Sequence, residues 1–188
     1  MSTVAGAGSG LRIRRVANGH LTAEETASIR GLLWSAFADT DPMTESDWAH
    51  AAAGEHFVAE LDGEIVAYAS VAERELYVDE RPIRTGYVEA VAVAPARQRR
   101  GIGTRLMGVV DAHLDASFDL GALGTGEHGF YRRLGWETWQ GKSSVRAPDG
   151  RRPTPDEDGY IMVLRTRSSP SVDVTAPIDC ILRSGDAW

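Results

Sequence analysis

A glycine-rich segment between a strand-forming run and a helix-forming run constrains the fold of this chain most strongly. The segment QRRGIGTRLM, residues 98–107, places Gly101 and Gly103 directly after polar and basic residues. Each glycine costs a helix about 1 kcal/mol relative to alanine, so a pair at a helix start needs a reason. A helix N-terminus collects free backbone N–H groups, and glycine lets a phosphate approach them closely. The segment therefore predicts a pyrophosphate-binding turn; the alternative is an ordinary glycine turn with a solvated basic rim.

Bulk composition limits the classes of protein to which the chain can belong. Its 188 residues, 43% hydrophobic and 25% charged, suffice for one ordinary soluble domain. No apolar run approaches the roughly 20 residues of a membrane-spanning helix, so we expect no membrane partner. The net charge of −7 argues against nucleic-acid binding and suits a cationic small substrate.

The N-terminus and the cysteine content indicate the cellular compartment. Residues 1–10 lack the basic and apolar regions of a secretory signal and predict a disordered leader. The single cysteine, Cys180, excludes an intramolecular disulfide and favours a reducing, cytoplasmic location. Because Cys180 lies in the apolar run IDCIL, buried packing is a better interpretation than nucleophilic chemistry.

Hydrophobic periodicity predicts a single α/β domain with a mixed sheet over residues 11–188. A threonine cap at Thr22 with Glu25 three residues later marks the start of the first helix, and Asp62-Gly63 predicts a hairpin turn. A bulge is expected in the run around Glu89, and residues 168–188 form a C-terminal tail. The expected strands are 11–16, 55–61, 64–76, 83–94, 118–123, 136–147 and 159–166, the expected helices are 22–37, 44–53, 101–117 and 126–136, and residues 148–158 are expected to form a loop.

The run VEAVAVAPARQRRGIGTRLM resembles the acetyl-CoA motif of the Gcn5-related N-acetyltransferases (GNAT), and FYRRLGW resembles the second signature of that family. The resemblance covers about residues 11–166 and implies the GNAT fold, a mixed central sheet splayed at the acetyl-CoA site and flanked by helices. It also implies that loop amides hold the pyrophosphate and that the end of the preceding strand pairs with the pantetheine. The implied acetyl-CoA positions are Val91, Ala92, Val93, Gln98, Arg99, Arg100, Gly101, Ile102, Gly103 and Thr104.

Finer similarities lie in GYVEAVAV, LGAL, TPDEDG and the terminal GDAW, which resemble the aminoglycoside 2'-N-acetyltransferases. That resemblance implies an aminoglycoside or related cationic amino sugar as acceptor, antibiotic resistance as the role, and a homodimer. It implies that Glu89 takes the amine proton through water and that Tyr131 is the general acid to the departing thiolate. The implied acceptor-binding positions are Asp41, Glu89, Ala90, Gly124, Glu157, Asp186 and Trp188, with Asp39 as the alternative to Asp41 because this loop carries an insertion.

The chain departs from that pattern at three of these positions, which affects the substrate range more than the chemistry. Ala90 replaces a glycine, Gly124 replaces a serine, and Glu157 replaces an aspartate. Glu89 is notable without any resemblance, because a carboxylate among apolar strand residues is costly unless it is used. No metal is expected in the site.

Two other functions and one structural alternative stay open. The first function is an acetyltransferase for another amine, such as an amino sugar, a polyamine or a peptide N-terminus; the second is a non-catalytic CoA-binding regulator. For the C-terminus, one hypothesis is that Asp186 and the Trp188 carboxylate close the acceptor cleft. The alternative is that the Trp188 ring packs as a hydrophobic plug.

Overall fold

The computed structural model describes residues 10–39 and 42–188, so Asp41 and most of the expected leader lie outside the described residues. The helices are α1 Ala23–Phe37, α2 Glu45–Ala52, α3 Ile102–Ser117 and α4 His128–Arg132. The strands are β1 Arg12–Val16, β2 Glu55–Leu61, β3 Glu64–Val78, β4 Arg81–Val93, β5 Leu120–Gly124, β6 Glu137–Thr138, β7 Ser143–Ala147, β8 Gly150–Pro153, β9 Ile161–Arg165 and β10 Ile178–Ile181.

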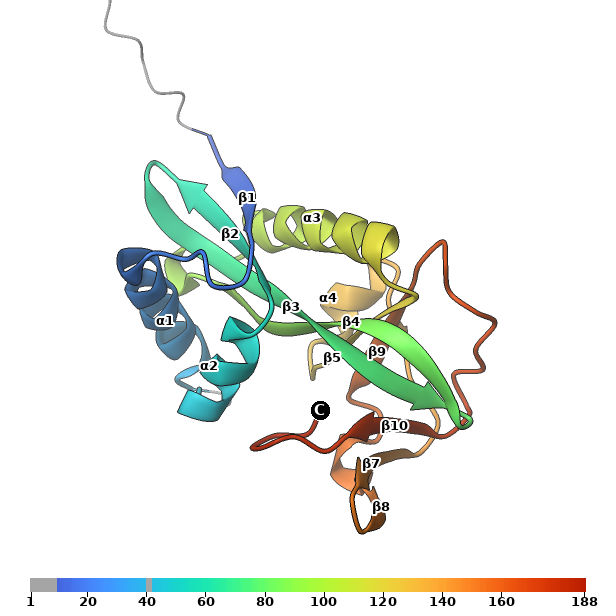
Figure 1. Ribbon diagram of the computed structural model, residues 1–188. Helices are drawn as coiled ribbons and strands as arrows, with labels where there is room; N and C mark the ends of the chain where they lie inside the picture. Colours follow the sequence, from blue (N-terminus) through green and yellow to red (C-terminus); the bar gives the residue numbers. More distant parts are fainter. Residues whose placement is uncertain (1–9, 40–41) are drawn as a thin grey trace, which may run out of the picture.

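The strands join in one mixed sheet that helices cover on both faces (Figure 1). Its order is β6-β9-β5-β4-β3-β10-β7-β8, and β2 pairs with both β1 and β3. Successive residues of β2 point to opposite faces, which explains its continuous apolar run. Phe57 and Ala59 belong to the core under α3, whereas Val58 between them belongs to the core under α1 and α2.

Local signals at the helix starts predict the structure well. Thr22 and Glu25 form the expected capping box at α1, and Thr44 with Asp47 forms a second one at α2. The predicted hairpin joins β2 to β3 through Asp62 and Gly63. The predicted mixed sheet is confirmed.

Two expectations after residue 136 are wrong. The single strand expected over 136–147 is two strands, β6 and β7, because the chain between them turns to pack against 174–176. Gly141 permits this contact, since a Cβ there would lie 1.8 Å from the carbonyl oxygen of Ala176. The loop expected over 148–158 contains β8, which pairs antiparallel with β7 through a turn at Pro148 and Asp149.

The C-terminal tail enters the sheet as an interior strand. β10 lies between β3 and β7, antiparallel to the former and parallel to the latter. Cys180 is fully buried there, as predicted.

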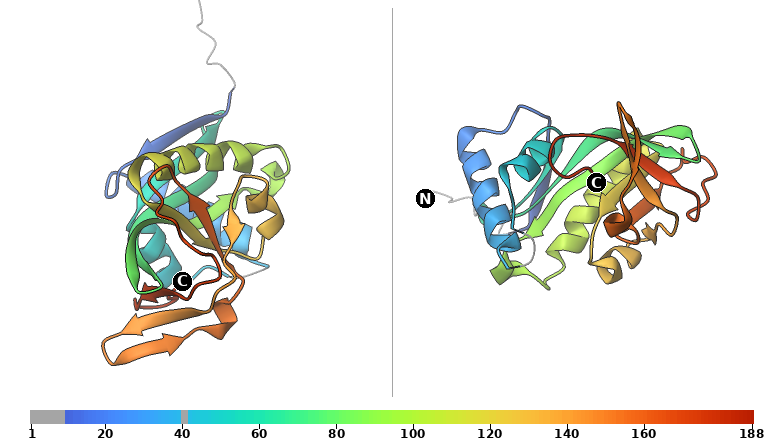
Figure 2. Two further views of the ribbon diagram at one scale, coloured as in Figure 1. Left: turned by 90° about the vertical axis from the view of Figure 1, so that its right-hand side faces the viewer. Right: turned by 90° about the horizontal axis from the view of Figure 1, so that it is seen from below.

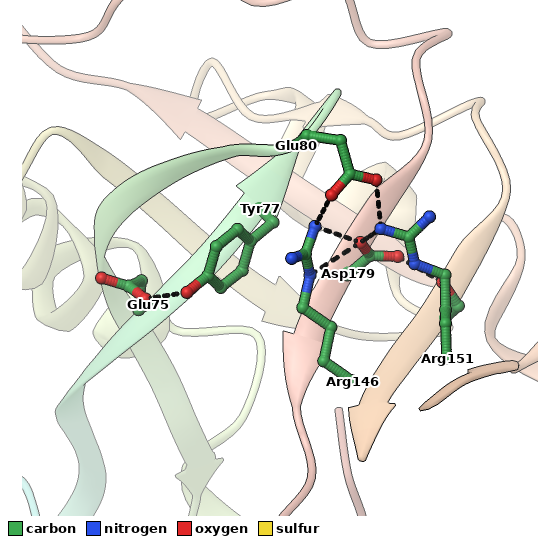
Figure 3. Close-up of polar contacts among 7 residues, drawn as sticks. Glu75, Tyr77, Glu80, Arg146, Arg151 and Asp179 are labelled. Carbon is green, nitrogen blue, oxygen red and sulfur yellow. Dashed lines mark hydrogen bonds and ion pairs between the residues drawn. The ribbon is translucent and has the colours of Figure 1, made fainter. Parts of the chain in front are cut away.

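The Asp179 carboxylate of β10, 3% exposed, accepts hydrogen bonds from Ser144 and Arg146 and pairs with Arg151 at 2.7 Å. Glu80 of the β3–β4 turn contacts the same two arginines (Figure 3). This network fixes β10, and with it the start of the last seven residues, against the hairpin β7–β8. No helix in the described part of the chain is long and apolar enough to cross a membrane.

Candidate functional site

Strands β4 and β5 separate partway along their length. They pair in parallel only from Thr85 to Tyr87 on β4, opposite 120–122 on β5, although β4 runs on to Val93. Opposite β3, Tyr68 pairs with Ala92 and Ser70 with Glu89, so β4 carries an extra residue there. Ala90 has φ +51°, which confirms the predicted bulge. Within the described residues, the β4 edge beyond Tyr87 has no strand partner on its β5 side, and an extended ligand fits there.

The glycine-rich segment follows β4 and begins α3. Gly101 is the N-cap of α3 with φ +76°, and Arg99 also has a positive φ of 58°. A Cβ at Gly101 would meet no atom within 4 Å, whereas one at Gly103 would lie 3.5 Å from Phe130 and from Val93. The first backbone hydrogen bond of α3 runs from Arg105 to Gly101, so the N–H groups of 102–104 precede the helical ladder. These features fit a pyrophosphate at the loop.

Other polar residues near the loop have structural roles. The Gln98 side-chain amide donates to the Val93 carbonyl at 3.2 Å and braces the turn, while Arg100 is exposed. A groove of about 860 Å³ adjoins the loop on its α1 side, but neither Glu89, Tyr131 nor the tail lines it. Glu25 and Glu60 in that groove already pair with Arg14. The predicted catalytic residues therefore lie outside this groove.

Tyr131 lies on α4, under α3, the helix that begins at the glycine-rich segment. Its side chain is buried and makes edge contacts with Phe130 and Trp136, at centroid distances of 4.9 and 5.9 Å. Burial, with smaller effects of the Asp111 and Glu127 charges, raises the pKa of the Tyr131 phenol above its ordinary value. Burial also raises the pKa of Asp111 to about 7, although its hydrogen bond from Trp136 Nε1 favours the charged form. A phenol with a raised pKa stays protonated at neutral pH.

Glu89 is half-buried and paired, which sequence reasoning missed. The Arg183 guanidinium donates from Nη1 to Glu89 Oε1 at 2.6 Å, and the two side chains are 19% and 13% exposed. We expected the cost of a carboxylate in this apolar strand to be offset by its use in function; Arg183 offsets it within the chain itself. Because 94 residues separate the two side chains, no local sequence pattern indicates the pair. The one available signal is that Arg183 is the single cation in the terminal run DCILRSGDAW.

The C-terminal tail ends beside Glu89. Arg183 Nε donates to the Asp186 carbonyl at 2.7 Å, and Nη2 donates to the backbone oxygen of Trp188 at 3.1 Å. The view from below in Figure 2 shows the C-terminus next to α2, whose His50 ring nitrogen lies 2.8 Å from the Ser184 carbonyl. The Trp188 ring is 5% exposed and donates from Nε1 to Thr154 Oγ1. The ring thus packs on its own chain, as the plug alternative held, while the Trp188 backbone oxygen and Glu89 contact the same arginine, Arg183.

Additional carboxylates gather at this end of the site. Burial, then the charges of Asp186 and Asp156, raises the pKa of Glu157 above its ordinary value, which reflects three acidic groups in proximity. Asp158, by contrast, pairs with Lys142 and accepts a hydrogen bond from the Ser143 backbone, so its role is structural.

The remaining implied acceptor positions lie at the ends of two elements. Gly124 ends β5, and a Cβ there would lie 3.4 Å from the Tyr87 hydroxyl. Asp39 lies in an exposed turn after α1; since Asp41 is outside the described residues, the structure does not distinguish between these two aspartates.

Comparison with known protein sequences gives the family. The model of the acetyltransferase (GNAT) domain matches residues 19–139. An aminoglycoside 2'-N-acetyltransferase of Mycolicibacterium fortuitum is 37% identical over 150 residues, which cover 78% of this chain and 77% of that protein. A mycothiol acetyltransferase of Nocardia farcinica is 33% identical over 167 residues, which cover 81% of this chain and 51% of that protein.

Solved structures share the fold at low sequence identity. A GNAT family acetyltransferase of Brucella melitensis, in complex with acetyl-CoA, has a TM-score of 0.60 at 22% identity and covers 88% of this chain and 94% of its own. A GNAT family N-acetyltransferase of Escherichia coli, in complex with CoA, has a TM-score of 0.65 at 15% identity and covers 91% of each chain. The chain belongs to the GNAT family of acetyltransferases, and its cosubstrate is acetyl-CoA.

Proposed function

We propose that this enzyme transfers the acetyl group of acetyl-CoA directly to the 2'-amino group of an aminoglycoside antibiotic. The proposal rests on one observation. Glu89 lies in β4 beyond the residues that pair with β5, and Arg183 contacts both Glu89 and the acidic C-terminal tail. A polycation complements such a surface, because each ammonium forms charge-assisted hydrogen bonds with carboxylates. The 37% identical aminoglycoside 2'-N-acetyltransferase supports the same acceptor.

Residues of β4 and α3 would hold the cosubstrate. When bound, acetyl-CoA supplies an activated acetyl thioester. The β4 edge at Val91, Ala92 and Val93 would pair with the pantetheine, and backbone N–H groups there would polarise the thioester carbonyl. The loop from Gln98 to Thr104 would hold the pyrophosphate at the α3 N-terminus.

Proton transfer would use one group on each side of the reacting nitrogen. An ammonium is not a nucleophile, so Glu89 first accepts a proton through water, using Oε2 because Arg183 contacts Oε1. Tyr131, whose raised pKa keeps it protonated, donates to the departing thiolate. No acyl-enzyme is needed, and Cys180 is a poor nucleophile, since burial raises the pKa of its thiol to about 11.

Acceptor binding would use the carboxylates at the C-terminal end. The ammonium groups of the acceptor would contact Glu157, Asp186 and the Trp188 carboxylate, together with Asp41 or Asp39. Ala90 and Gly124 would make van der Waals contacts with the acceptor. Burial and, to a smaller extent, the charges of Asp186 and Asp156 raise the pKa of Glu157, and a bound ammonium would offset that repulsion.

We further propose a cytoplasmic homodimer that confers aminoglycoside resistance. Light scattering measures the mass in solution. Expression in a susceptible bacterium should raise the inhibitory concentration of tobramycin, and expression of the Tyr131→Phe variant provides the inactive control.

A binding titration of tobramycin with and without CoA, together with mass spectrometry of the product that forms with acetyl-CoA, tests the acceptor assignment. We expect one acetyl group on the 2'-nitrogen. Acetylation at another nitrogen, or at none, would refute it.

A second candidate acceptor is a different amino sugar, which the 33% identity to a mycothiol acetyltransferase favours. A panel of amino sugars, polyamines and peptides assayed for CoA release distinguishes the two, because the preferred acceptor has the highest kcat/KM. Binding of CoA without turnover of any amine would instead indicate a regulator.

A further inference from the structure

Arg183 lies at the junction between the proposed base and the C-terminal tail. Each of its three guanidinium nitrogens has its own acceptor: Glu89 Oε1, the Asp186 carbonyl and the Trp188 backbone oxygen. With 19% of the side chain exposed, the guanidinium is largely shielded from water, so these contacts are stronger than surface ion pairs. One side chain therefore joins a strand residue to the last three residues of the chain.

The charges around Arg183 explain why a cation is needed there. Glu89, Asp186 and Glu157 bring several negative charges to one end of the site, and like charges in proximity repel. A fixed guanidinium offsets this repulsion without occupying both oxygens of Glu89. Among the described residues, Arg183 hydrogen-bonds Glu89 only at Oε1, which leaves Oε2 for a water molecule or an ammonium.

We propose that Arg183 is a positioning residue for the acetyl transfer: it orients the Glu89 carboxylate and couples that orientation to the closed position of the C-terminal tail. The inference rests on the proposed role of Glu89 and assigns to Arg183 a function beyond holding the tail. Arginine suits this task because its planar fork contacts three acceptors in fixed directions, which a lysine ammonium cannot reproduce.

The chain contains a matched control for this proposal. Arg74 of β3 also holds the tail, donating from Nη2 to the Ala187 carbonyl at 2.6 Å, and it stacks on the Tyr87 ring. Its hydrogen bond goes to the tail and not to Glu89. Arg74→Gln therefore removes a tail anchor with the Glu89–Arg183 pair still present, whereas Arg183→Gln removes both functions.

The experiment measures kcat and both Michaelis constants for the wild type, Arg183→Gln, Arg183→Lys and Arg74→Gln, with melting temperatures as the check on folding. We expect Arg183→Gln to lower kcat at least about tenfold and raise the acceptor KM, with Arg183→Lys intermediate. Arg74→Gln should raise only the acceptor KM. In a Glu89→Gln background, Arg183→Gln should change kcat less than about twofold, because the group that it orients is already gone.

Equal effects of Arg183→Gln and Arg74→Gln on acceptor KM alone would overturn the proposal, as would independent, multiplying effects of Glu89→Gln and Arg183→Gln on kcat. If Arg183→Gln does not fold, Arg183→Lys decides, and wild-type constants in that variant count against the proposal. A wrong acceptor assignment appears differently, as lack of tobramycin turnover by the wild type. The variants are then compared with the best amine of the panel.

Discussion

The two sides of the proposed site are built in different ways. The acetyl-CoA side is a continuous segment from β4 through the glycine-rich loop into α3, so neighbours in sequence are neighbours in space. The acceptor side joins Glu89 to residues of a 3-10 turn and of the tail, with its central ion pair spanning 94 residues. A local motif depends on backbone conformation, whereas an assembled one depends on every contact that brings its parts together. Changes in the tail should therefore affect the acceptor and leave the cosubstrate unaffected.

The largest expected effect is at Tyr131, the proposed general acid. Tyr131→Phe keeps the buried ring and removes the hydroxyl, so kcat should fall roughly ten- to several-hundred-fold while both Michaelis constants change little. Steady-state kinetics across a pH series measures it. A wild-type rate at every pH would remove Tyr131 from the mechanism, and Phe130→Leu controls for disturbed packing around it.

The C-terminus gives the sharpest test of the acceptor side. Two or three residues added after Trp188 extend the tail beyond the backbone oxygen that Arg183 contacts and leave the glycine-rich loop untouched. The aminoglycoside KM should rise at least about tenfold, which corresponds to 1.4 kcal/mol, while the acetyl-CoA KM stays constant. The same residues added at the N-terminus are the control. Identical constants for the tagged and untagged enzymes would mean that the tail is purely structural.

Gly101 provides the reciprocal test of the cosubstrate side. Gly101→Val places a branched side chain where an added Cβ meets only open space, at a φ of +76°, and so obstructs an approaching pyrophosphate. The acetyl-CoA KM should rise several-fold with the acceptor KM unchanged. Gly101→Asn separates obstruction from backbone strain, because asparagine tolerates this conformation better. Calorimetry that shows normal CoA binding by the valine variant would refute a phosphate-binding loop.

The smallest expected effect concerns the support beneath Tyr131. Burial raises the pKa of Asp111 from 3.8 to about 7 in the folded chain, so the folded state binds this proton more tightly than the unfolded state does. Its contribution to stability is therefore full below about pH 4 and lost as the pH rises through about 7. The melting temperature of Asp111→Asn relative to wild type should therefore rise between those limits, as thermal unfolding followed across a pH series would measure. A constant difference would contradict the shift.

The features that depend on short-range interactions are predictable from the sequence alone. The capping box at Thr22, the bulge next to Glu89 and the helix start at Gly101 follow from backbone preferences within a few residues. The resemblance in the glycine-rich motif predicted the family and the cosubstrate, which the comparisons confirm. Side-chain periodicity was also sufficient for the mixed sheet.

The contacts between distant segments depend on tertiary packing. The chain leaves the sheet after β6 because Gly141 packs against the Ala176 carbonyl. The run that contains Cys180 becomes an interior strand because it pairs with β3 on one side and with β7 on the other. The same strand brings Arg183 to Glu89, a pairing that no local pattern encodes. A carboxylate in an apolar strand must find a counter-charge, but sequence does not specify which cation reaches it; the packing of the tail does.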